Sequence, residues 1–164
     1  MTSNIILQSL LQQKVLVLDG AMGTMIQAHD LSEQDFRGTE FVQHNFDLKG
    51  NNDLLSLTQP DIIQDIHLKY LHSGADIIET NTFNSSSIAQ ADYGLEDRVT
   101  ELNYRSVVLA KNAIKQYQNE VPSPSPKFIA GVLGPTNRTA SVSPDVNDPS
   151  ARNITFEELL IISK

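Results

Sequence analysis

The order of hydrophobic and polar positions along the chain follows two patterns, and the first is a set of short apolar runs. These runs lie within 15–18, 75–79 and 128–133, and each is followed by polar residues and turn formers. A short run without polar interruption, as at 15–18, is typical of a strand buried on both faces in a parallel sheet covered by helices. The pattern therefore predicts three strands.

Between these runs, apolar residues recur every three or four positions, which predicts helices. The predicted helices span 3–13, 22–28, 58–73, 96–118 and a last segment beginning at 155. Thr58 with Asp61, and Thr155 with Glu158, have the spacing of a capping box at a helix start. Alternating helices and strands predict an α/β fold with a parallel sheet.

The segment 29–57 has little periodicity, but it contains three phenylalanines, Phe36, Phe41 and Phe46. Aromatic anchors argue against disorder, so we expect an ordered loop that packs on the sheet. Residues 122–126 alternate proline and serine and predict a stiff, exposed connector. The helix from 155 reaches Lys164 without a capping glycine, and three strands would leave an open sheet with two unpaired edges. We therefore expect a truncated domain.

Polar residues gather where each predicted strand ends. These residues are Asp19 and Gly20 after the first strand, Glu79, Thr80 and Asn81 after the second, and Gly134, Pro135, Thr136, Asn137 and Arg138 after the third. The carboxyl ends of parallel strands meet on one face, where ligands bind in such sheets. Carboxylates suit an ammonium group, and backbone N–H groups or Arg138 suit a carboxylate, so this rim could hold a small zwitterion.

Structural roles for the same residues stay open at this point. Asp19 could cap the helix that follows while Gly20 only makes the turn. Asn81 and Asn137 could hydrogen-bond loops, and Arg138 could pair with Asp145 or Asp148.

Composition excludes several classes of protein. The 164 residues carry a net charge of -8 and no cluster of basic residues, so nucleic acid and anionic membranes are not expected partners. There is no cysteine, which excludes disulfides and any thiolate metal site within this chain. No signal peptide and no apolar run of about 20 residues is present, so a cytoplasmic location is expected.

No other motif points to a different chemistry. The four histidines have no spacing that suits a metal site, and His67 and His72 are expected to be solvated. The sequence between Gly20 and Gly23 lacks the third glycine of a dinucleotide-binding fingerprint. There is no phosphate-binding Gly-Lys-Ser/Thr loop and no nucleophile elbow of a hydrolase.

Four segments together resemble cobalamin-dependent methionine synthase, in the amino-terminal part of its homocysteine-binding barrel. They are VLVLDGAMGTMIQ (15–27), DLKGNNDLL (47–55), GADIIETNTFNS (74–85) and GVLGPTNRTASVSPDVNDPSARNIT (131–155). The resemblance implies a (β/α)8 barrel, of which this chain would supply about the first three βα units. Residues 1–13 would form an N-terminal helix and residues 14–164 the portion of the barrel.

The resemblance also implies a reaction and a set of site residues. In the family, a zinc ion held by cysteine thiolates activates homocysteine, whose sulfur takes a methyl group from methylcobalamin and ultimately from methyltetrahydrofolate. Asp19 corresponds to an acid near the substrate amino group. The other residues implied to border the homocysteine pocket are Gly20, Gly23, Thr24, Glu79, Thr80, Asn81, Gly134, Pro135 and Thr136.

The absence of cysteine separates this chain from that pattern. We expect that the chain alone neither binds zinc or cobalamin tightly nor transfers a methyl group, and that it depends on the rest of the barrel and on folate and cobalamin modules. Two alternatives remain: another homocysteine S-methyltransferase of the same barrel family, using betaine or S-methylmethionine, or a non-catalytic remnant or interaction domain. The last predicts a monodisperse chain with a cooperative melt, whereas a broken barrel predicts aggregation.

Overall fold

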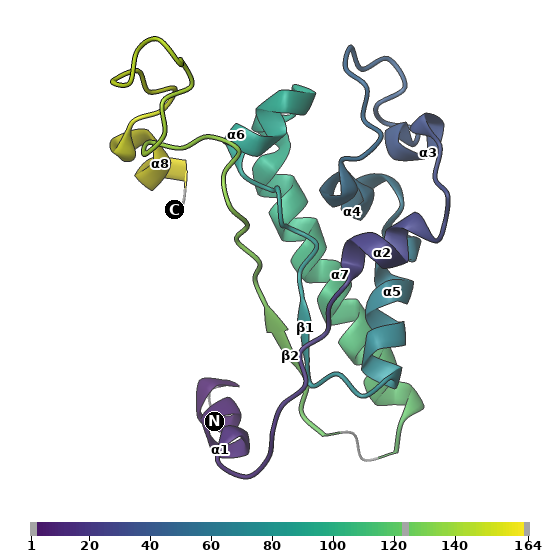
Figure 1. Cartoon of the computed structure of the whole chain (residues 1–164). Helices are drawn as coiled ribbons and strands as arrows, with labels where there is room; N and C mark the ends of the chain where they lie inside the picture. The colour runs from purple at the N-terminus through teal and green to yellow at the C-terminus, as the bar shows by residue number, and fades with distance from the viewer. Residues whose placement is uncertain (1–2, 123–124, 163–164) are drawn as a thin grey trace.

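The computed structural model describes residues 3–122 and 125–162. Its elements in chain order are α1 (Ser3–Leu11), α2 (Met22–Gln27), α3 (Glu33–Arg37), the 3-10 helix η1 (Asn52–Leu54), α4 (Leu55–Thr58), α5 (Pro60–His72), β1 (Ile77–Glu79), α6 (Ser87–Gln90), the 3-10 helices η2 (Ala91–Tyr93) and η3 (Glu96–Arg98), α7 (Val99–Glu120), β2 (Phe128–Ala130) and α8 (Phe156–Ile162). All five predicted helices are present, with ends shifted by a few residues. Figure 1 shows α5 and α7 side by side along one face of the strands. Helix α1 lies near the amino-terminal ends of the strands.

The sheet is small and parallel. β1 pairs with β2, with Ile77 opposite Phe128 and Glu79 opposite Ala130. A single parallel bridge joins Leu18 to Ile77, so the segment at 15–18 lies on the other side of β1. The parallel α/β architecture predicted from the sequence is confirmed, and the closed barrel stays a prediction.

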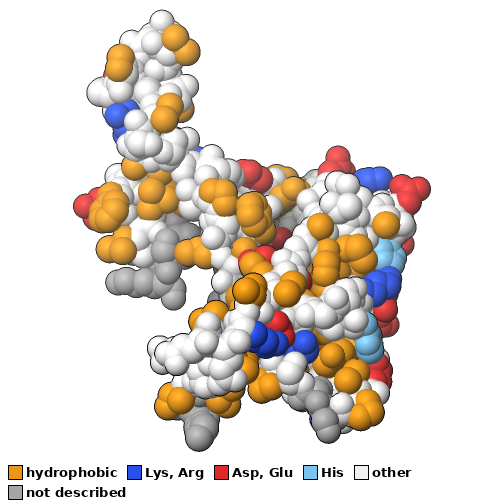
Figure 2. All heavy atoms as spheres, turned by 60° about the horizontal axis from the view of Figure 1, so that its bottom comes forward, with side chains coloured by type: hydrophobic (Ala, Val, Ile, Leu, Met, Phe, Trp, Pro, Cys, Tyr) orange, Lys and Arg blue, Asp and Glu red, His pale blue; other side chains and the backbone are white. Residues whose placement is uncertain are grey.

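The predicted burial of the first strand is wrong. Val15 is 87% exposed, Val17 53% and Leu18 49%. The reason is that this segment has a neighbour on one side only: the Val17 carbonyl accepts hydrogen bonds from the Asp76 and Ile77 N–H groups, at 2.8 and 3.1 Å. The third strand also ends earlier than predicted, and Leu133 is 74% exposed. Figure 2 shows hydrophobic side chains reaching the surface at several places on one face.

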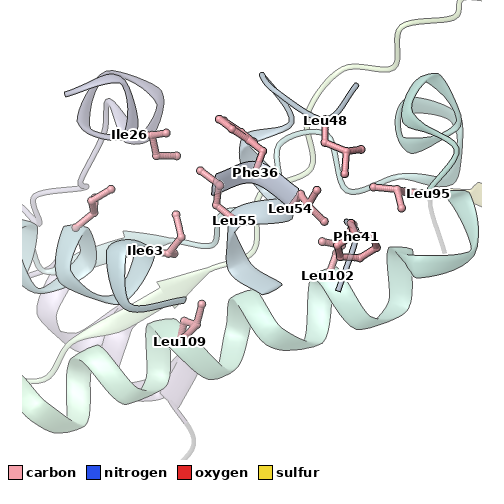
Figure 3. Packing of buried hydrophobic residues seen from close by; sticks show 11 residues of the cluster. Ile26, Phe36, Phe41, Leu48, Leu54, Leu55, Ile63, Leu95, Leu102 and Leu109 are labelled. Atoms are coloured by element: carbon pink, nitrogen blue, oxygen red, sulfur yellow. The ribbon is translucent and has the colours of Figure 1, made fainter. Parts of the chain in front are cut away.

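The main core lies between α5, α7 and the segments that pack against them, which include α2, α3 and α4 (Figure 3). Its buried residues are Ile26, Phe36, Phe41, Leu48, Leu54, Leu55, Ile63, Ile66, Leu95, Leu102 and Leu109. A second cluster joins the sheet to the same two helices, where Ile78 of β1 is fully buried against Ala110 and Ala113 of α7. Because Ala110 and Ala113 are small, α7 can pack closely against β1. This packing positions the strand relative to the two helices.

The start of α5 differs from the predicted capping box. Gln59 is the N-cap residue and provides no side-chain cap, while Thr58 belongs to α4. Pro60 occupies the first turn as expected, because the N–H that proline lacks has no helical partner there. The capping box at Thr155 and Glu158 is confirmed, since each side chain bonds the other residue's backbone N–H.

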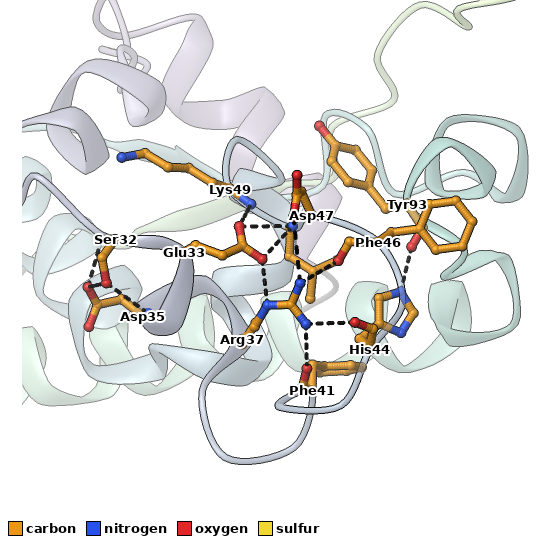
Figure 4. Close-up of polar contacts among 11 residues, drawn as sticks. Ser32, Glu33, Asp35, Arg37, Phe41, His44, Phe46, Asp47, Lys49 and Tyr93 are labelled. Atoms are coloured by element: carbon orange, nitrogen blue, oxygen red, sulfur yellow. Dashed lines mark hydrogen bonds and ion pairs between the residues drawn. The ribbon is translucent and has the colours of Figure 1, made fainter.

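The segment 29–57 is ordered, as predicted, but it is not a loop throughout, because it contains α3, η1 and most of α4. Arg37 of α3 is its organising residue (Figure 4). The Arg37 guanidinium donates to the backbone carbonyls of Phe41, His44 and Phe46 at 3.3, 2.7 and 2.8 Å. Glu33 in turn accepts from Arg37 at 2.6 Å. Phe36 and Phe41 are buried anchors, but Phe46 is about half exposed, so the prediction for that third anchor is wrong.

The prediction of a solvated His67 is also wrong. His67 lies on α5, is fully buried, and neither ring nitrogen has a hydrogen-bond partner among the described residues. Burial lowers the pKa of His67 to about 4, so the ring is neutral at pH 7. His72 is exposed as predicted and bonds Glu120 at 2.9 Å.

At the amino-terminal end of the strands, Asp76 ties three segments together. It accepts from Lys14 at 2.8 Å and from the Val17 N–H at 3.2 Å, and Lys127 lies 3.6 Å away. Burial acts to raise the pKa of Asp76, but these hydrogen bonds and charges hold it below its usual range.

Two further sequence predictions concern the ends and connectors of the chain. The predicted connector at 122–126 includes residues 123 and 124, and the final residue of the chain is Lys164; these three lie outside the described residues.

Within the described ranges, none of the helices combines the length and the apolar character required to span a bilayer.

Candidate functional site

A cavity of about 340 Å³ opens at the carboxyl ends of the strands. It is lined by Asp19, Gly20, Ala21, Met22 and Gly23 from the turn after the first segment, by Asn52 and Asp53 of η1, by Glu79, Thr80, Asn81, Thr82, Phe83 and Asn84 after β1, and by Val132. Polar residues from the ends of neighbouring parallel segments therefore share one cavity, as expected for this kind of sheet.

Asp19 is fixed by β1 rather than by the helix after it. Its two carboxylate oxygens accept the Glu79 N–H at 3.0 and 3.1 Å. The alternative role as a helix cap is excluded, because α2 has Ala21 as its N-cap residue and no side-chain cap. Burial raises the pKa of Asp19 to about 6, the Glu79 N–H opposes this rise, and the negative charge of Glu79 adds to it. Asp19 is thus a carboxylate that is ionised at pH 7 and would gain from a nearby cation.

The loop after β1 is joined to the chain that follows β2 by two threonines. The Thr80 hydroxyl accepts the Val132 N–H at 3.0 Å, and the Thr82 hydroxyl donates to the Val132 carbonyl at 2.8 Å. Thr80 and Thr82 also bond each other at 2.8 Å. These contacts extend the β1–β2 pairing beyond the strands and hold the cavity wall.

The floor of the cavity comes from Asn52 and Asp53, which the sequence analysis did not assign to the site. Asn81 donates to the Asn52 carbonyl at 2.8 Å and to the Ser56 hydroxyl at 3.2 Å. Ser106 of α7 donates to Ser56 at 2.8 Å. The suggestion that Asn81 hydrogen-bonds a loop is therefore correct, and Asn81 lines the cavity as well. The sequence did contain a signal for this part of the site, because polar residues in the middle of DLKGNNDLL come directly before the apolar Leu54 and Leu55.

The third predicted strand end contributes backbone rather than side chains. A Cβ on Gly134 would lie 2.1 Å from the Phe83 carbonyl oxygen, so only glycine allows this close approach of the two loops. Gly134, Pro135, Thr136 and Thr24 do not line the cavity, whereas Asp19, Gly20, Gly23, Glu79, Thr80 and Asn81 do. Asp19 and Glu79 lie at the same end of the sheet, and the approach of Gly134 to Phe83 brings the third segment to that end too.

Two residues of the predicted rim lie elsewhere. Arg138 lines a separate cavity with Glu96 and Glu158. Asn137 donates to Asp92 at 2.7 Å. The expectation that Arg138 could hold a ligand carboxylate in the shared cavity is therefore wrong, because Val132 is the last residue of this segment that lines the cavity. Arg138 has no ion pair with Asp145 or Asp148 among the described residues.

The lining is strongly acidic. Asp19, Asp53 and Glu79 supply three carboxyl groups, and no Lys, Arg or His is among the lining residues. Such a cavity suits a ligand with an ammonium group, and a ligand carboxylate would have to use backbone N–H groups. In the described part of the chain, no group of three His, Cys, Asp or Glu residues is arranged to hold a metal ion. The described residues therefore offer zinc no fitting set of ligands.

Fold and site together define a parallel α/β domain with an acidic cavity at the carboxyl ends of its strands. The family model for homocysteine S-methyltransferases matches residues 16–162, and the chain belongs to this family.

Solved structures agree with this assignment. The metallated form of the homocysteine methyltransferase MmuM from Escherichia coli is similar with a TM-score of 0.63 and 27% sequence identity, over 79% of this chain and 41% of that chain. The oxidised form gives the same TM-score and identity, with 40% of that chain covered. The chain thus spans about two fifths of the length of the enzyme it matches.

Proposed function

We propose that this chain forms the homocysteine-binding part of a homocysteine S-methyltransferase and holds the amino group of the substrate. The observation that carries the proposal is the acidic cavity in which Asp19 and Glu79 meet, in a member of this family. The bound ammonium would face carboxylates at the sheet end, and the thiol would extend away from them. Asp19 would orient the substrate and would not take part in breaking or forming a bond.

Calorimetric titration of L-homocysteine into the 164-residue chain tests the proposal. Asp19→Asn removes the charge while keeping an oxygen that can accept the Glu79 N–H. Loss of one charged hydrogen bond is expected to raise the Kd roughly 10- to 100-fold. The matched control is Asp97→Asn, because Asp97 is exposed and its side chain pairs with none of the residues that the structure describes. Equal affinity of the chain and its Asp19→Asn variant would contradict the proposal.

Two further readouts identify the group that is recognised. The chain should bind 4-mercaptobutanoate, which lacks the amino group, about as weakly as the Asp19→Asn variant binds homocysteine. Because the pKa of Asp19 is about 6 and the ligand ammonium stays charged, affinity should fall about tenfold between pH 7 and pH 5. Affinity that is constant over this range would argue against an ionised Asp19 as the partner.

For the methyl donor, we propose methylcobalamin, supplied ultimately from methyltetrahydrofolate by further modules of a longer enzyme. The segment 131–155 supports this donor through its resemblance to cobalamin-dependent methionine synthase. S-Methylmethionine or betaine is the alternative donor within the same family. Because the sequence has no cysteine, the chain alone should form no methionine with any of the three donors. Methionine formation with one of them, measured by chromatography, would identify the donor and contradict the expected inactivity.

A further inference from the structure

The proposed function places Asp19 and Glu79 at the ligand ammonium. It gives no role to Asp53, which is the third carboxylate of the cavity. Asp53 lies in η1, is 2% exposed, and lines the cavity together with Asp19 and Glu79. Its Oδ2 accepts the Asn84 N–H at 2.6 Å and the Ser85 hydroxyl at 2.8 Å. One oxygen atom thus bonds two consecutive residues of the loop after β1.

That loop carries most of one cavity wall. Its residues 80–84 all line the cavity, and its first part is held by the Thr80 and Thr82 contacts to Val132. Beyond Phe83, the loop turns back toward α6, and Asn103 of α7 holds the Ser85 carbonyl from outside at 2.8 Å. Asp53 holds the same turn from the cavity side, so Asn81 and Phe83 lie between two fixed points.

Asp53 is an unusual choice for a purely structural contact. A buried carboxylate is costly, and burial raises the pKa of Asp53 to about 6 against the lowering effect of the bonds from Ser85 and Asn84. An ionised carboxylate accepts these two hydrogen bonds more strongly than a neutral amide oxygen would, which offsets part of that cost. Costly buried groups of this kind concentrate at functional sites.

We propose that Asp53 is a positioning residue, which holds the loop at 80–85 in the shape that binds the ligand. This inference rests on the proposed function, since the ligand is taken to be homocysteine. Asp53 acts through Asn84 and Ser85: without its oxygen the Asn84 N–H and the Ser85 hydroxyl lose their partner, the turn opens, and the wall formed by Phe83 and Asn84 moves from its place.

The test compares three variants with the unmodified 164-residue chain. Asp53→Ala removes both hydrogen bonds, Asp53→Asn keeps an acceptor oxygen, and Ser85→Ala removes one bond without changing the carboxylate. Asp76→Ala is the matched control: Asp76 is also a buried carboxylate that ties segments together, but it lies at the opposite end of the strands. The readouts are the Kd for L-homocysteine and the hydrogen-exchange rate of the Asn84 amide measured by NMR.

For Asp53→Ala we expect a Kd about tenfold higher and exchange of the Asn84 amide at least about tenfold faster. Asp53→Asn should stay within about twofold of the unmodified chain in both readouts, and Ser85→Ala should weaken binding about fivefold, which keeps the test valid if Asp53→Ala does not fold. Asp76→Ala should lower the stability but leave the Kd within about twofold.

Two outcomes separate this inference from the proposed function. If Asp53→Ala and Ser85→Ala bind homocysteine as the unmodified chain does while Asp19→Asn does not, the positioning role is wrong and the proposed function stands. If the unmodified chain does not bind homocysteine, the proposed function fails, and the exchange rate of the Asn84 amide then decides by itself whether Asp53 holds the loop.

Discussion

Replacing the buried His67 by leucine should stabilise the chain, and by an amount that depends on pH. Both ring nitrogens lack partners among the described residues, and leaving a buried polar group unsatisfied costs about 1–3 kcal/mol. His67→Leu fills a similar volume without that cost. At pH 7.5 we therefore expect the free energy of unfolding to rise by about 1–2 kcal/mol.

The pH dependence follows from proton binding. The ordinary pKa of 6.5 falls to about 4 in the folded chain, so the unfolded chain binds the proton more tightly. Above pH 6.5 the ring is neutral in both the folded and the unfolded chain, so proton binding to His67 costs no stability. As the pH falls toward 4, the unfolded chain takes up the proton first, and the free energy of unfolding drops by about 3 kcal/mol in total. The gap between His67→Leu and the unmodified chain should therefore be about 2.5 kcal/mol wider at pH 4.5 than at pH 7.5.

The comparison with a variant is needed because other groups titrate in the same range. Asp19 and Asp53 have a raised pKa of about 6, so their folded forms bind protons more tightly and their contribution to stability grows as the pH falls from about 7. These terms are common to both chains and cancel in the difference.

The assay is urea unfolding followed by circular dichroism at half-unit steps from pH 4.5 to 7.5. His29→Leu serves as the control, since His29 is exposed and its ring has no hydrogen-bond partner in the described part of the chain. The control should leave the stability within about 0.5 kcal/mol at every pH. A gap between His67→Leu and the unmodified chain that widens by less than about 1 kcal/mol would refute the reasoning, because a buried neutral ring requires the larger change.

Three other substitutions test the contacts that shape the site. Gly134→Ala places a methyl group 2.1 Å from the Phe83 carbonyl oxygen, so the two loops must separate; we expect a loss of about 1–3 kcal/mol in unfolding free energy and weaker homocysteine binding. Arg37→Ala frees the carbonyls of Phe41, His44 and Phe46, and should cost about 2–3 kcal/mol and accelerate amide exchange between residues 41 and 48. Asp76→Asn leaves the buried Lys127 without its ion pair; it should cost about 3 kcal/mol at pH 7, and the cost should shrink only when the pH falls well below the ordinary aspartate pKa of 3.8, where Asp76 itself becomes protonated, as urea unfolding would show.

The sequence is informative about the fold where one local pattern decides the structure. Helical periodicity located all five predicted helices, and the polar residues after each apolar run placed Asp19, Glu79 and Asn81 at one cavity. The helices follow from the spacing of hydrophobic residues, and the shared cavity follows from the common direction of parallel strands. Both are encoded by residues that are neighbours in the sequence.

Features that depend on distant neighbours were not predictable in this way. Burial of 15–18 requires a second pairing partner, and the described chain supplies only β1, so Val15 and Val17 stay exposed. His67 is buried because α5 presents that face of the helix to the core, although a histidine is a poor signal of burial. Arg138 follows the correct strand but lies outside the cavity, because Val132 is the last residue of that segment in the lining.

The cavity floor was missed for a related reason. Asp53 meets Asn84 and Ser85 only because η1 and the loop after β1 are brought together across more than 30 residues of chain, as the separations of 31 and 32 show. Nothing in the segment 47–55 taken alone indicates which loop its carboxylate will meet.

The central claim, that homocysteine occupies the acidic cavity at the carboxyl ends of the strands, is tested most directly by a two-dimensional ¹H–¹⁵N NMR titration of the labelled 164-residue chain. L-Homocysteine should shift the backbone resonances of Gly20, Gly23, Glu79, Thr80 and Asn81, while those of Asp76 and Lys127 at the opposite end of the strands stay unchanged. Saturating shifts confined to the neighbourhood of Arg138 and Glu158, or no shifts at millimolar ligand, would contradict the claim.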